Sequence, residues 1–142
     1  MNRLTPFLFF AAGLSADVLS KEWALRTLPP PTLHAGGDFF ALALHFNRGA
    51  AFSLLRSVPG AALLLSVAGV CLLAAMYRSL PAFRRSPAWG LLFAGAAGNM
   101  ADRLLHGYVV DWFRAGPLHM NAADILLCAG GALLMLQMLR KK

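Results

Sequence analysis

The stretch VPGAALLLSVAGVCLLAAMY, residues 58–77, runs for twenty residues without a charged side chain. An α-helix of that length crosses a lipid hydrocarbon core of about 30 Å. A second run, residues 122–139, covers eighteen residues and contains one charged side chain, that of Asp124. These two runs predict membrane-spanning helices and so favour an all-α membrane protein.

The composition of the whole chain agrees with a protein whose solvent is lipid. Of its 142 residues, 58% are hydrophobic and 13% are charged, and the mean hydropathy is positive, at +0.61. A soluble domain of this size cannot bury so much apolar surface in one core. The length suits a single integral membrane domain, residues 1–142.

Two further segments, residues 4–28 and 87–105, are apolar but interrupted by polar side chains. A charge in the middle of a membrane costs roughly 2.5 kcal/mol or more, so these polar groups should face other helices or the water interface. With both segments counted as spans, the sequence predicts a bundle of four transmembrane helices. Residues 1–16 leave an alternative open, a cleaved secretory signal, although Leu14 fits its recognition position poorly.

The charges differ between the two sides of this four-span arrangement. One side, formed by the chain ends and the loop between the second and third spans, has no acidic residue and carries seven basic ones: Arg3, Arg78, Arg84, Arg85, Arg140, Lys141 and Lys142. All six acidic residues lie with the other two loops, residues 28–57 and 106–121, and the adjoining span ends. Because positive segments stay in the cytoplasm, both termini are expected inside and these two loops outside.

The net charge of +7 and the pI near 10.5 do not indicate a nucleic-acid-binding protein. The basic residues are scattered at span ends and form no dense patch interleaved with aromatic side chains. Cys71 and Cys128 fall within expected spans and lack the spacing of a zinc site or a disulfide framework. We therefore expect no nucleic-acid partner, no metal and no organic cofactor.

A short β element is expected in the first outer loop. Bulky side chains alternate along residues 38–46, DFFALALHF, and a polar turn follows at Asn47, Arg48 and Gly49. Alternation that ends in turn residues is typical of a strand. The sequence thus predicts a small extracytoplasmic β element beside the helical bundle.

Polar residues form two groups at helical spacing. One face of the third expected span carries residues spaced i, i+3, i+4 and i+7: Asn99, Asp102, Arg103 and His106. On the first span, Asp17 and Lys21 are four residues apart and can form an ion pair. Either group could simply hold the bundle together through contacts between helices, and either could line a site.

Asp111 and Asp124 differ from these groups because neither has a basic neighbour at helical spacing. Asn121 could cap the last helix, with Asp124 favoured in its first turn by the helix dipole, and Asp111 could be an idle interfacial carboxylate. The two aspartates also bracket an excursion between the third and fourth spans, so they can meet near the outer face. Neighbouring carboxyls cannot both ionise, and the pair then offers an acid and a base at one site.

Five segments, in order along nearly the whole chain, carry a resemblance to a known family: DVLSK (17–21), NRGAAFS (47–53), GNMADR (98–103), GYVVDW (107–112) and NAAD (121–124). The chain resembles lipoprotein signal peptidase, also called signal peptidase II. The resemblance implies an aspartic protease that crosses the bacterial inner membrane several times, and we expect it to be a monomer. Such an enzyme acts on lipid-modified prolipoproteins within membrane lipid and cuts just before the diacylglyceryl-modified cysteine.

The same resemblance implies roles for individual residues. Asp111 and Asp124 match the catalytic pair of the family. Further residues match positions that bind substrate or brace the site: Asp17, Lys21, Asn47, Gly49, Asn99, Asp102, Arg103 and Asn121. The chain departs from the family pattern at three positions, Val18, Ala94 and Met120, and its stretch between the two aspartates is shorter than usual. These departures leave the pair intact and bear on substrate preference and on the shape of the outer loop.

Other functions remain as alternatives. A small transporter or proton-relay protein would also place aspartate and arginine side chains within the membrane, and an inactive relative could act as a chaperone or binding protein. A Ser/Lys peptidase is disfavoured because Ser20 and Lys21 are adjacent on one helix and point apart.

Overall fold

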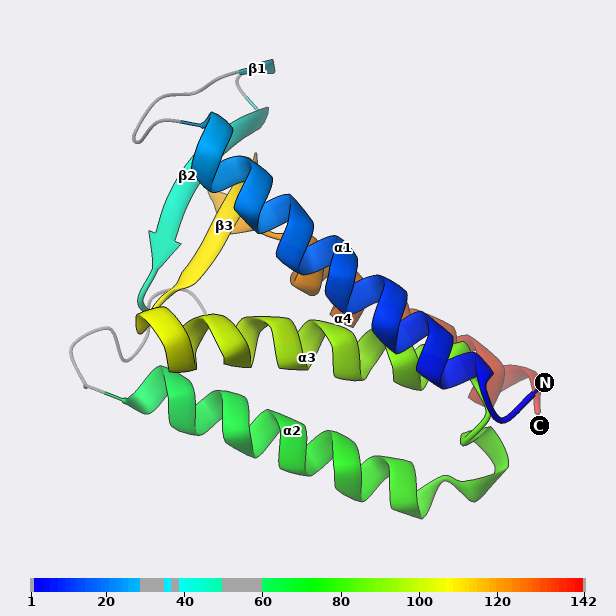
Figure 1. Cartoon of the computed structure of the whole chain (residues 1–142). Helices are drawn as coiled ribbons and strands as arrows, with labels where there is room; N and C mark the ends of the chain where they lie inside the picture. Colours follow the sequence, from blue (N-terminus) through cyan, green and yellow to red (C-terminus); the bar gives the residue numbers. More distant parts are fainter. Residues whose placement is uncertain (1, 29–34, 37–38, 50–59, 142) are drawn as a thin grey trace.

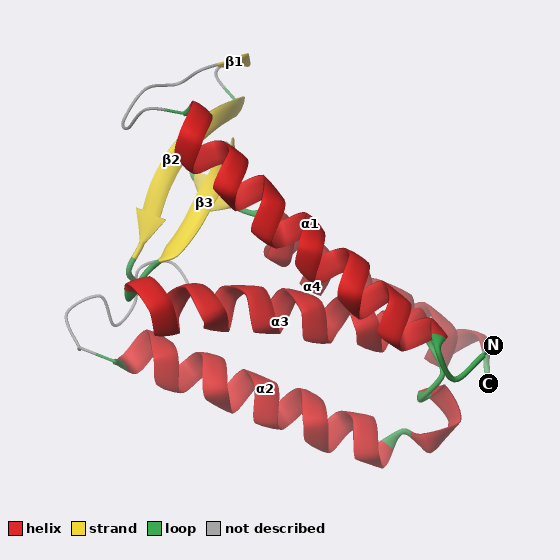
Figure 2. Cartoon of the chain, in the orientation of Figure 1, coloured by secondary structure: helices red, strands yellow, loops and turns green. Residues whose placement is uncertain are grey.

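The computed structural model describes residues 2–28, 35–36, 39–49 and 60–141. The chain is mostly helical (Figures 1 and 2), with elements in this order: α1 (Thr5–Thr27), β1 (Ala35–Gly36), β2 (Phe40–Asn47), α2 (Ala61–Ser79), the 3-10 helix η1 (Pro81–Phe83), α3 (Pro87–His106), β3 (Val109–Ala115), β4 (Leu118–Met120) and α4 (Ala122–Arg140).

Helix α3 is the centre of the bundle, and α1, α2 and α4 each pack against it. The strands form one antiparallel sheet in the order β1-β2-β3-β4. The sheet lies at one end of the bundle, and both termini lie at the other end with the connection between α2 and α3 (Figure 1). The expected small β element is confirmed as β2, and the sheet is larger than predicted because β3 and β4 extend it.

The ends of α3 and α4 have local causes in the sequence. The Ser86 side chain accepts a hydrogen bond from the amide of Ala88, and Pro87 begins α3; proline is favoured there because the first helical amides have no partner within the helix. Gly107 ends α3 with a φ of 76°, a left-handed conformation that glycine adopts without steric cost. Asn121 begins α4 as its N-cap.

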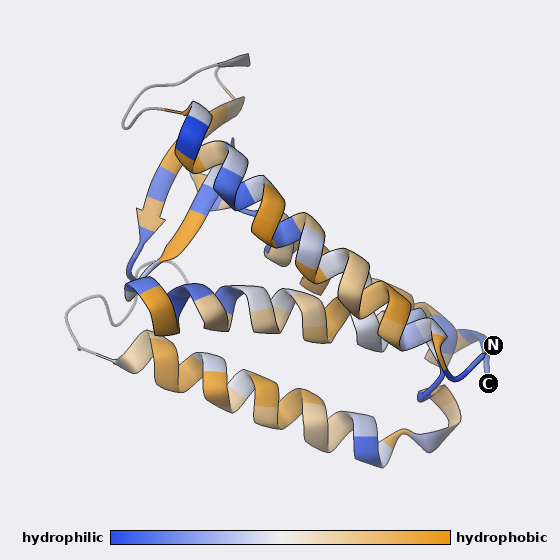
Figure 3. Ribbon diagram, in the orientation of Figure 1, coloured by the Kyte–Doolittle hydropathy of each residue, from blue (hydrophilic) through white to orange (hydrophobic). Residues whose placement is uncertain are grey.

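Two helices, Ala61–Ser79 and Ala122–Leu139, are long and apolar enough to cross a membrane. None of the residues of α2 is buried in the described structure, and Figure 3 shows hydrophobic residues along most of its length. Hydrophilic residues on α1 and α3 lie mainly toward the sheet (Figure 3). The four expected helices are therefore present, and a membrane crossing by α1 and α3 stays a prediction.

Glycines on α3 allow its neighbours to approach closely. A methyl group at Gly95 would overlap the backbone carbonyl oxygen of Ala123 on α4, and one at Gly90 would overlap that of Pro6 on α1. Small residues at helix contacts are the usual means of close packing in membranes. The sheet end of α4 is thus held against α3 by the absence of a side chain at Gly95.

We expect Gly95→Ala to lower the free energy of unfolding by about 1–3 kcal/mol, since the overlap is with backbone and not with a movable side chain. The matched control is Gly69→Ala in α2, where no described atom lies within 4 Å of the added carbon. That variant should be neutral or gain up to about 1 kcal/mol from helix propensity. Melting temperatures in one detergent compare the two, and equal effects would mean that the contact at Gly95 is not tight.

Candidate active site

Asp111 and Asp124 are brought together at the junction of the sheet and the bundle. Asp111 lies on β3 and is 1% exposed, and its Cα pairs with that of His45 on β2. Asp124 lies in the first turn of α4. The pairing of β3 with β2 positions the carboxylate of Asp111, and the N-terminus of α4 positions that of Asp124. The two side chains are therefore held by different elements.

Asn121 connects the two carboxylates. Its side-chain amide donates to Asp111 Oδ1 at 2.7 Å, and its side-chain oxygen accepts from the backbone amide of Asp124 at 3.1 Å. Asp124 Oδ2 in turn accepts from the backbone amide of Asn121 at 3.1 Å. This reciprocal pair is a capping box, and it fixes Asp124 relative to the residue that holds Asp111.

Two more asparagines donate hydrogen bonds to the carboxylates. Asn47 Nδ2 donates to Asp111 Oδ2 at 3.1 Å, and Asn99 Nδ2 donates to Asp124 Oδ1 at 2.9 Å. Asn99 Oδ1 accepts from the Asn121 side chain at 3.1 Å. Each described carboxylate oxygen of the pair therefore has an amide donor, and its orientation is set before any ligand arrives.

The environment of Asp111 favours its protonated form. Burial is the main cause, and the nearby charge of Asp124 adds to it; together they raise the pKa of Asp111 to about 7. Hydrogen bonds from Asn47 and Asn121 and the charge of Lys21 act in the opposite direction and are weaker. A carboxyl with a pKa near neutrality can hold a proton and also release it, as an acid–base group must.

Lys21 forms a second polar centre behind the pair. Its Nζ lies 2.7 Å from Asp17 Oδ2, 3.0 Å from Asp102 Oδ2 and 3.3 Å from Asn99 Oδ1. The three donor hydrogens of an ammonium group match these three acceptors. The i,i+4 pair of Asp17 and Lys21 on α1 is thus part of a buried network that reaches α3.

The carboxylates of this second centre reach two further elements. Asp17 Oδ1 accepts from the backbone amide of Ala123 in α4 at 2.8 Å, and Asp102 Oδ2 accepts from that of Val110 in β3 at 3.0 Å. Val110 and Ala123 adjoin Asp111 and Asp124 in the sequence. The lysine centre therefore ties α1 and α3 to the backbones that carry the two aspartates.

Arg103 connects the segment after β2 to α2. Its Nη1 donates to Ser66 Oγ at 3.0 Å, and its Nη2 donates to the carbonyl of Gly49 at 3.3 Å. The Gly49 amide donates to Asn47 Oδ1 at 3.1 Å, so Arg103 supports the turn that presents Asn47 to Asp111. Its buried Nε has no hydrogen-bond partner within the described part of the chain.

The ten residues expected at the site are thus joined by hydrogen bonds and ion pairs into one network. His106, which shares the polar face of the third expected span, lies outside this network: it is exposed and stacks on Tyr108 at 5.7 Å between ring centroids. Sequence reasoning missed Ser66. It also missed His45, whose Nδ1 lies 3.9 Å from Asp111 Oδ2 and whose ring stacks on His119 at 4.4 Å. The strand alternation of residues 40–47 could have indicated His45 only if its pairing with β3 had been known.

The described residues contain no cluster of the side chains that usually bind metals. Within residues 2–28, 35–36, 39–49 and 60–141, no group of three or more His, Cys, Asp or Glu side chains is arranged to hold an ion. Cys71 and Cys128 are exposed and free.

Comparisons with known proteins agree with the geometry. The family model described as "Signal peptidase (SPase) II" matches residues 9–140. The chain is 36% identical over 149 residues to the "Lipoprotein signal peptidase" of Azoarcus sp. (strain BH72), covering 96% of this chain and 84% of that protein. It is also 36% identical over 137 residues to the protein of the same name from Burkholderia ambifaria (strain MC40-6), covering 88% and 81%.

Two solved structures share the fold, and each is described as a bacterial membrane enzyme determined by the in meso method. The first superposes with a TM-score of 0.76 at 24% identity and covers 96% of this chain and 88% of its own. The second gives a TM-score of 0.75 at 25% identity and covers 97% and 94%. From the family match over nearly the whole chain and the identity to curated relatives, this chain belongs to the signal peptidase II family.

Proposed function

We propose that this protein is a membrane protease that removes the signal peptide from lipid-modified prolipoproteins, cutting before the diacylglyceryl-modified cysteine, and that its mechanism is aspartic. Family membership supports the activity and the substrate class. The observation that carries the mechanism is the buried Asp111 carboxyl joined through Asn121 to Asp124. Family membership does not favour the transporter and proton-relay alternative.

The two carboxyls can share the acid and base roles. Asp124 accepts a proton from a water molecule as the water oxygen attacks the scissile carbonyl carbon, and Asp111 donates its proton to the carbonyl oxygen. When the resulting diol collapses, the C–N bond breaks, Asp124 gives a proton to the leaving nitrogen and Asp111 regains its own. Asn47, Asn99 and Asn121 hold the carboxylates in position throughout.

We further propose that all four helices cross the bacterial inner membrane in a single domain, with the sheet and the aspartate pair near its outer face. The exposed large apolar side chains support this placement; on α2 they include Leu64, Leu65 and Leu72. The end of the bundle opposite the sheet carries basic residues and no acidic ones, which favours a cytoplasmic location. The enzyme would act there as a monomer, within membrane lipid.

The direct test incubates the purified protein in detergent with a prolipoprotein that carries the diacylglyceryl group, and follows release of the signal peptide by mass spectrometry. The control is the same precursor without the lipid, which should be cut much more slowly. Release that does not depend on the lipid would contradict the proposed substrate class. No release from either precursor would contradict the proposed activity.

The orientation makes a separate prediction. A reporter that is active only outside the cytoplasm should be active when inserted near Pro117, between β3 and β4, and silent near Arg84 or after Lys142. The physical reason is the retention of the basic end in the cytoplasm. The reverse pattern would overturn the orientation without affecting the proposed chemistry.

The raised pKa of Asp111 predicts how stability depends on pH. Because that pKa is about 7 in the folded protein against an ordinary 3.8, the folded state binds more protons than the unfolded state between these values. The free energy of unfolding should therefore fall as pH rises from about 4 to about 7, by up to roughly 1.4 kcal/mol per pH unit from this group. Melting curves of the parent and Asp111→Asn across this range isolate the effect, which the variant should lack. Parallel curves would mean that Asp111 titrates in the ordinary acid range.

A further inference from the structure

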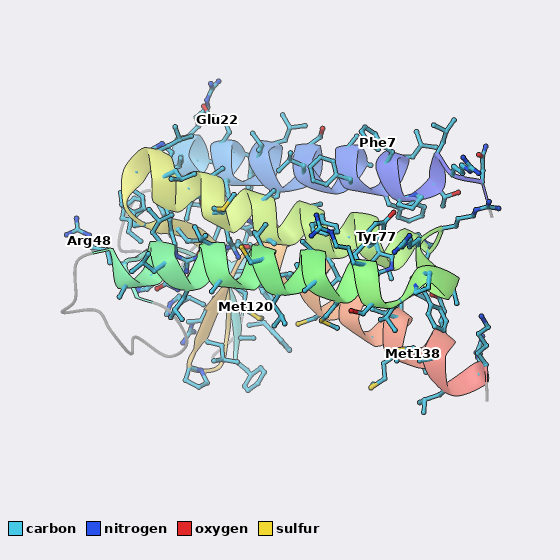
Figure 4. All side chains as sticks on the ribbon, turned by 90° about the horizontal axis from the view of Figure 1, so that it is seen from below. Phe7, Glu22, Arg48, Tyr77, Met120 and Met138 are labelled. Atoms are coloured by element: carbon cyan, nitrogen blue, oxygen red, sulfur yellow. The ribbon has the colours of Figure 1, made fainter. Side chains whose placement is uncertain are left out.

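A furrow opens between α1 and α2 at the end of the bundle opposite the sheet. Both helices pack against α3 rather than against each other, so α3 forms the floor between them. The furrow contains a cavity of about 310 Å³ with an almost entirely apolar lining, which includes Phe7, Phe10, Tyr77, Trp89 and Phe93. In Figure 4, Phe7 on α1 and Tyr77 on α2 lie in this half of the bundle.

A basic cavity of about 630 Å³ adjoins the furrow, and Tyr77 lines both. Its charged side chains are those of Arg3, Arg84 and Arg85. Nitrogen atoms gather beside Tyr77 in Figure 4. No acidic residue occurs in residues 1–16 or 60–101, and the ion pairs of the described residues include neither Arg3 nor Arg85. The cavity is therefore a concentration of positive charge, and no acidic side chain of the described residues lies nearby to neutralise it.

Arg84 is held in place at the boundary of the two cavities. Its Nε donates to the carbonyl of Tyr77 at 3.2 Å, and its Nη2 donates to that of Arg78 at 2.7 Å. Its guanidinium carbon lies 5.5 Å from the centroid of the Tyr77 ring. These contacts leave Nη1 available, so a fixed guanidinium can donate to an anion at no further cost in side-chain ordering.

We propose that the furrow and the basic cavity together bind one anionic phospholipid. Its phosphate would lie among Arg3, Arg84 and Arg85, and one acyl chain would lie along the aromatic lining. Basic pockets between membrane helices are suited to phosphate headgroups, guanidinium groups pair well with phosphate oxygens, and tyrosine and tryptophan favour the level of the headgroups. With the orientation proposed above, this lipid belongs to the cytoplasmic leaflet, at the opposite end from the aspartate pair.

The charge and the apolar furrow argue jointly for a lipid. A free phosphate would bind the arginines and leave the aromatic furrow unfilled. A zwitterionic lipid would fill the furrow but would bring its own cation toward the arginines. An anionic phospholipid satisfies both cavities, and its binding would join α1, α2 and the η1 turn where the helices make few contacts with each other.

The test measures lipid binding to the delipidated full-length protein by native mass spectrometry in one detergent. Phosphatidylglycerol and phosphatidylcholine with identical chains are compared, and the parent should prefer phosphatidylglycerol. Arg3→Gln with Arg85→Gln should weaken phosphatidylglycerol binding by roughly fivefold per arginine. The matched control, Arg78→Gln with Arg140→Gln, changes the charge equally at the same end and should leave the affinity near that of the parent, because neither side chain lines the cavities.

Two further measurements distinguish binding of the whole lipid from binding of its headgroup alone. Glycerol 3-phosphate should fail to compete with phosphatidylglycerol, and a dihexanoyl form of the lipid should bind more weakly than the long-chain form. Equal binding of phosphatidylcholine, equal losses in the two double variants, or competition by glycerol 3-phosphate would each overturn the proposal. A lipid-free melting temperature for each variant confirms that it is folded, and none of these measurements depends on protease activity.

Discussion

Asp111→Asn and Asp124→Asn should each slow signal-peptide release by about 10²–10⁴-fold. The chemistry needs one carboxyl to accept a proton and the other to donate one, and an asparagine side chain does neither. Initial rates on a lipid-modified prolipoprotein measure the effect. Glu22→Gln is the control, since it also removes one carboxylate but lies in an exposed pair with Arg26, and it should retain the parent rate.

The thermal stability of Asp111→Asn shows whether Asp111 has a catalytic or a structural role. The substitution removes a buried carboxyl whose ionised form is disfavoured by burial and by Asp124, so above about pH 7 it favours folding. It also places an amide donor where Asn47 or Asn121 now donates, which costs about one hydrogen bond of 0.5–1.5 kcal/mol. These effects oppose each other, so the melting temperature should stay near that of the parent while activity is lost. A much lower melting temperature would make Asp111 a structural residue and remove the main support for the aspartic mechanism.

Lys21→Met should be the most destabilising of the single substitutions considered. It leaves the buried carboxylate of Asp17 and the partly buried carboxylate of Asp102 without the cation that lies 2.7 Å and 3.0 Å from them. Breaking a buried ion pair from one side costs about 3–5 kcal/mol, and here one ammonium serves two carboxylates. Because Asp17 and Asp102 also bind the backbones of Ala123 and Val110, activity should fall together with the melting temperature.

The control for Lys21→Met is Arg26→Met on the same helix. Arg26 forms an i,i+4 pair with Glu22, and the two side chains are 76% and 51% exposed. An exposed pair of this kind contributes about 0–1 kcal/mol, so this variant should melt near the parent temperature. If Lys21→Met kept the parent melting temperature and lost only activity, Lys21 would belong to the chemistry of the site and not to its support.

Local sequence patterns predicted the helices and the polar groups on them, and the resemblance to the family assigned these groups to one site. Helical periodicity placed Asp17 and Lys21 on one face, and the cap pattern at Asn121 gave the start of α4, as the structure confirms. Apolar runs gave the helix bounds to within a few residues, since length and hydropathy depend only on neighbours in the chain.

Only the tertiary structure decided which elements supply the hydrogen-bond and ion-pair partners of the site residues. Periodicity along one helix could not show that Lys21 also binds Asp102, that Arg103 reaches Ser66 on α2, or that His45 lies opposite Asp111. Such contacts depend on the register of β2 with β3 and on the close approach of α3 and α4 at Gly95, and both are set by packing between segments distant in sequence. The sequence by itself therefore determined the helices and the chemical groups of the site. The tertiary structure decided the distances between those groups. The reason is that the two carboxyls of the pair lie on different elements, so their separation depends on how these elements pack and not on residue spacing within a single element.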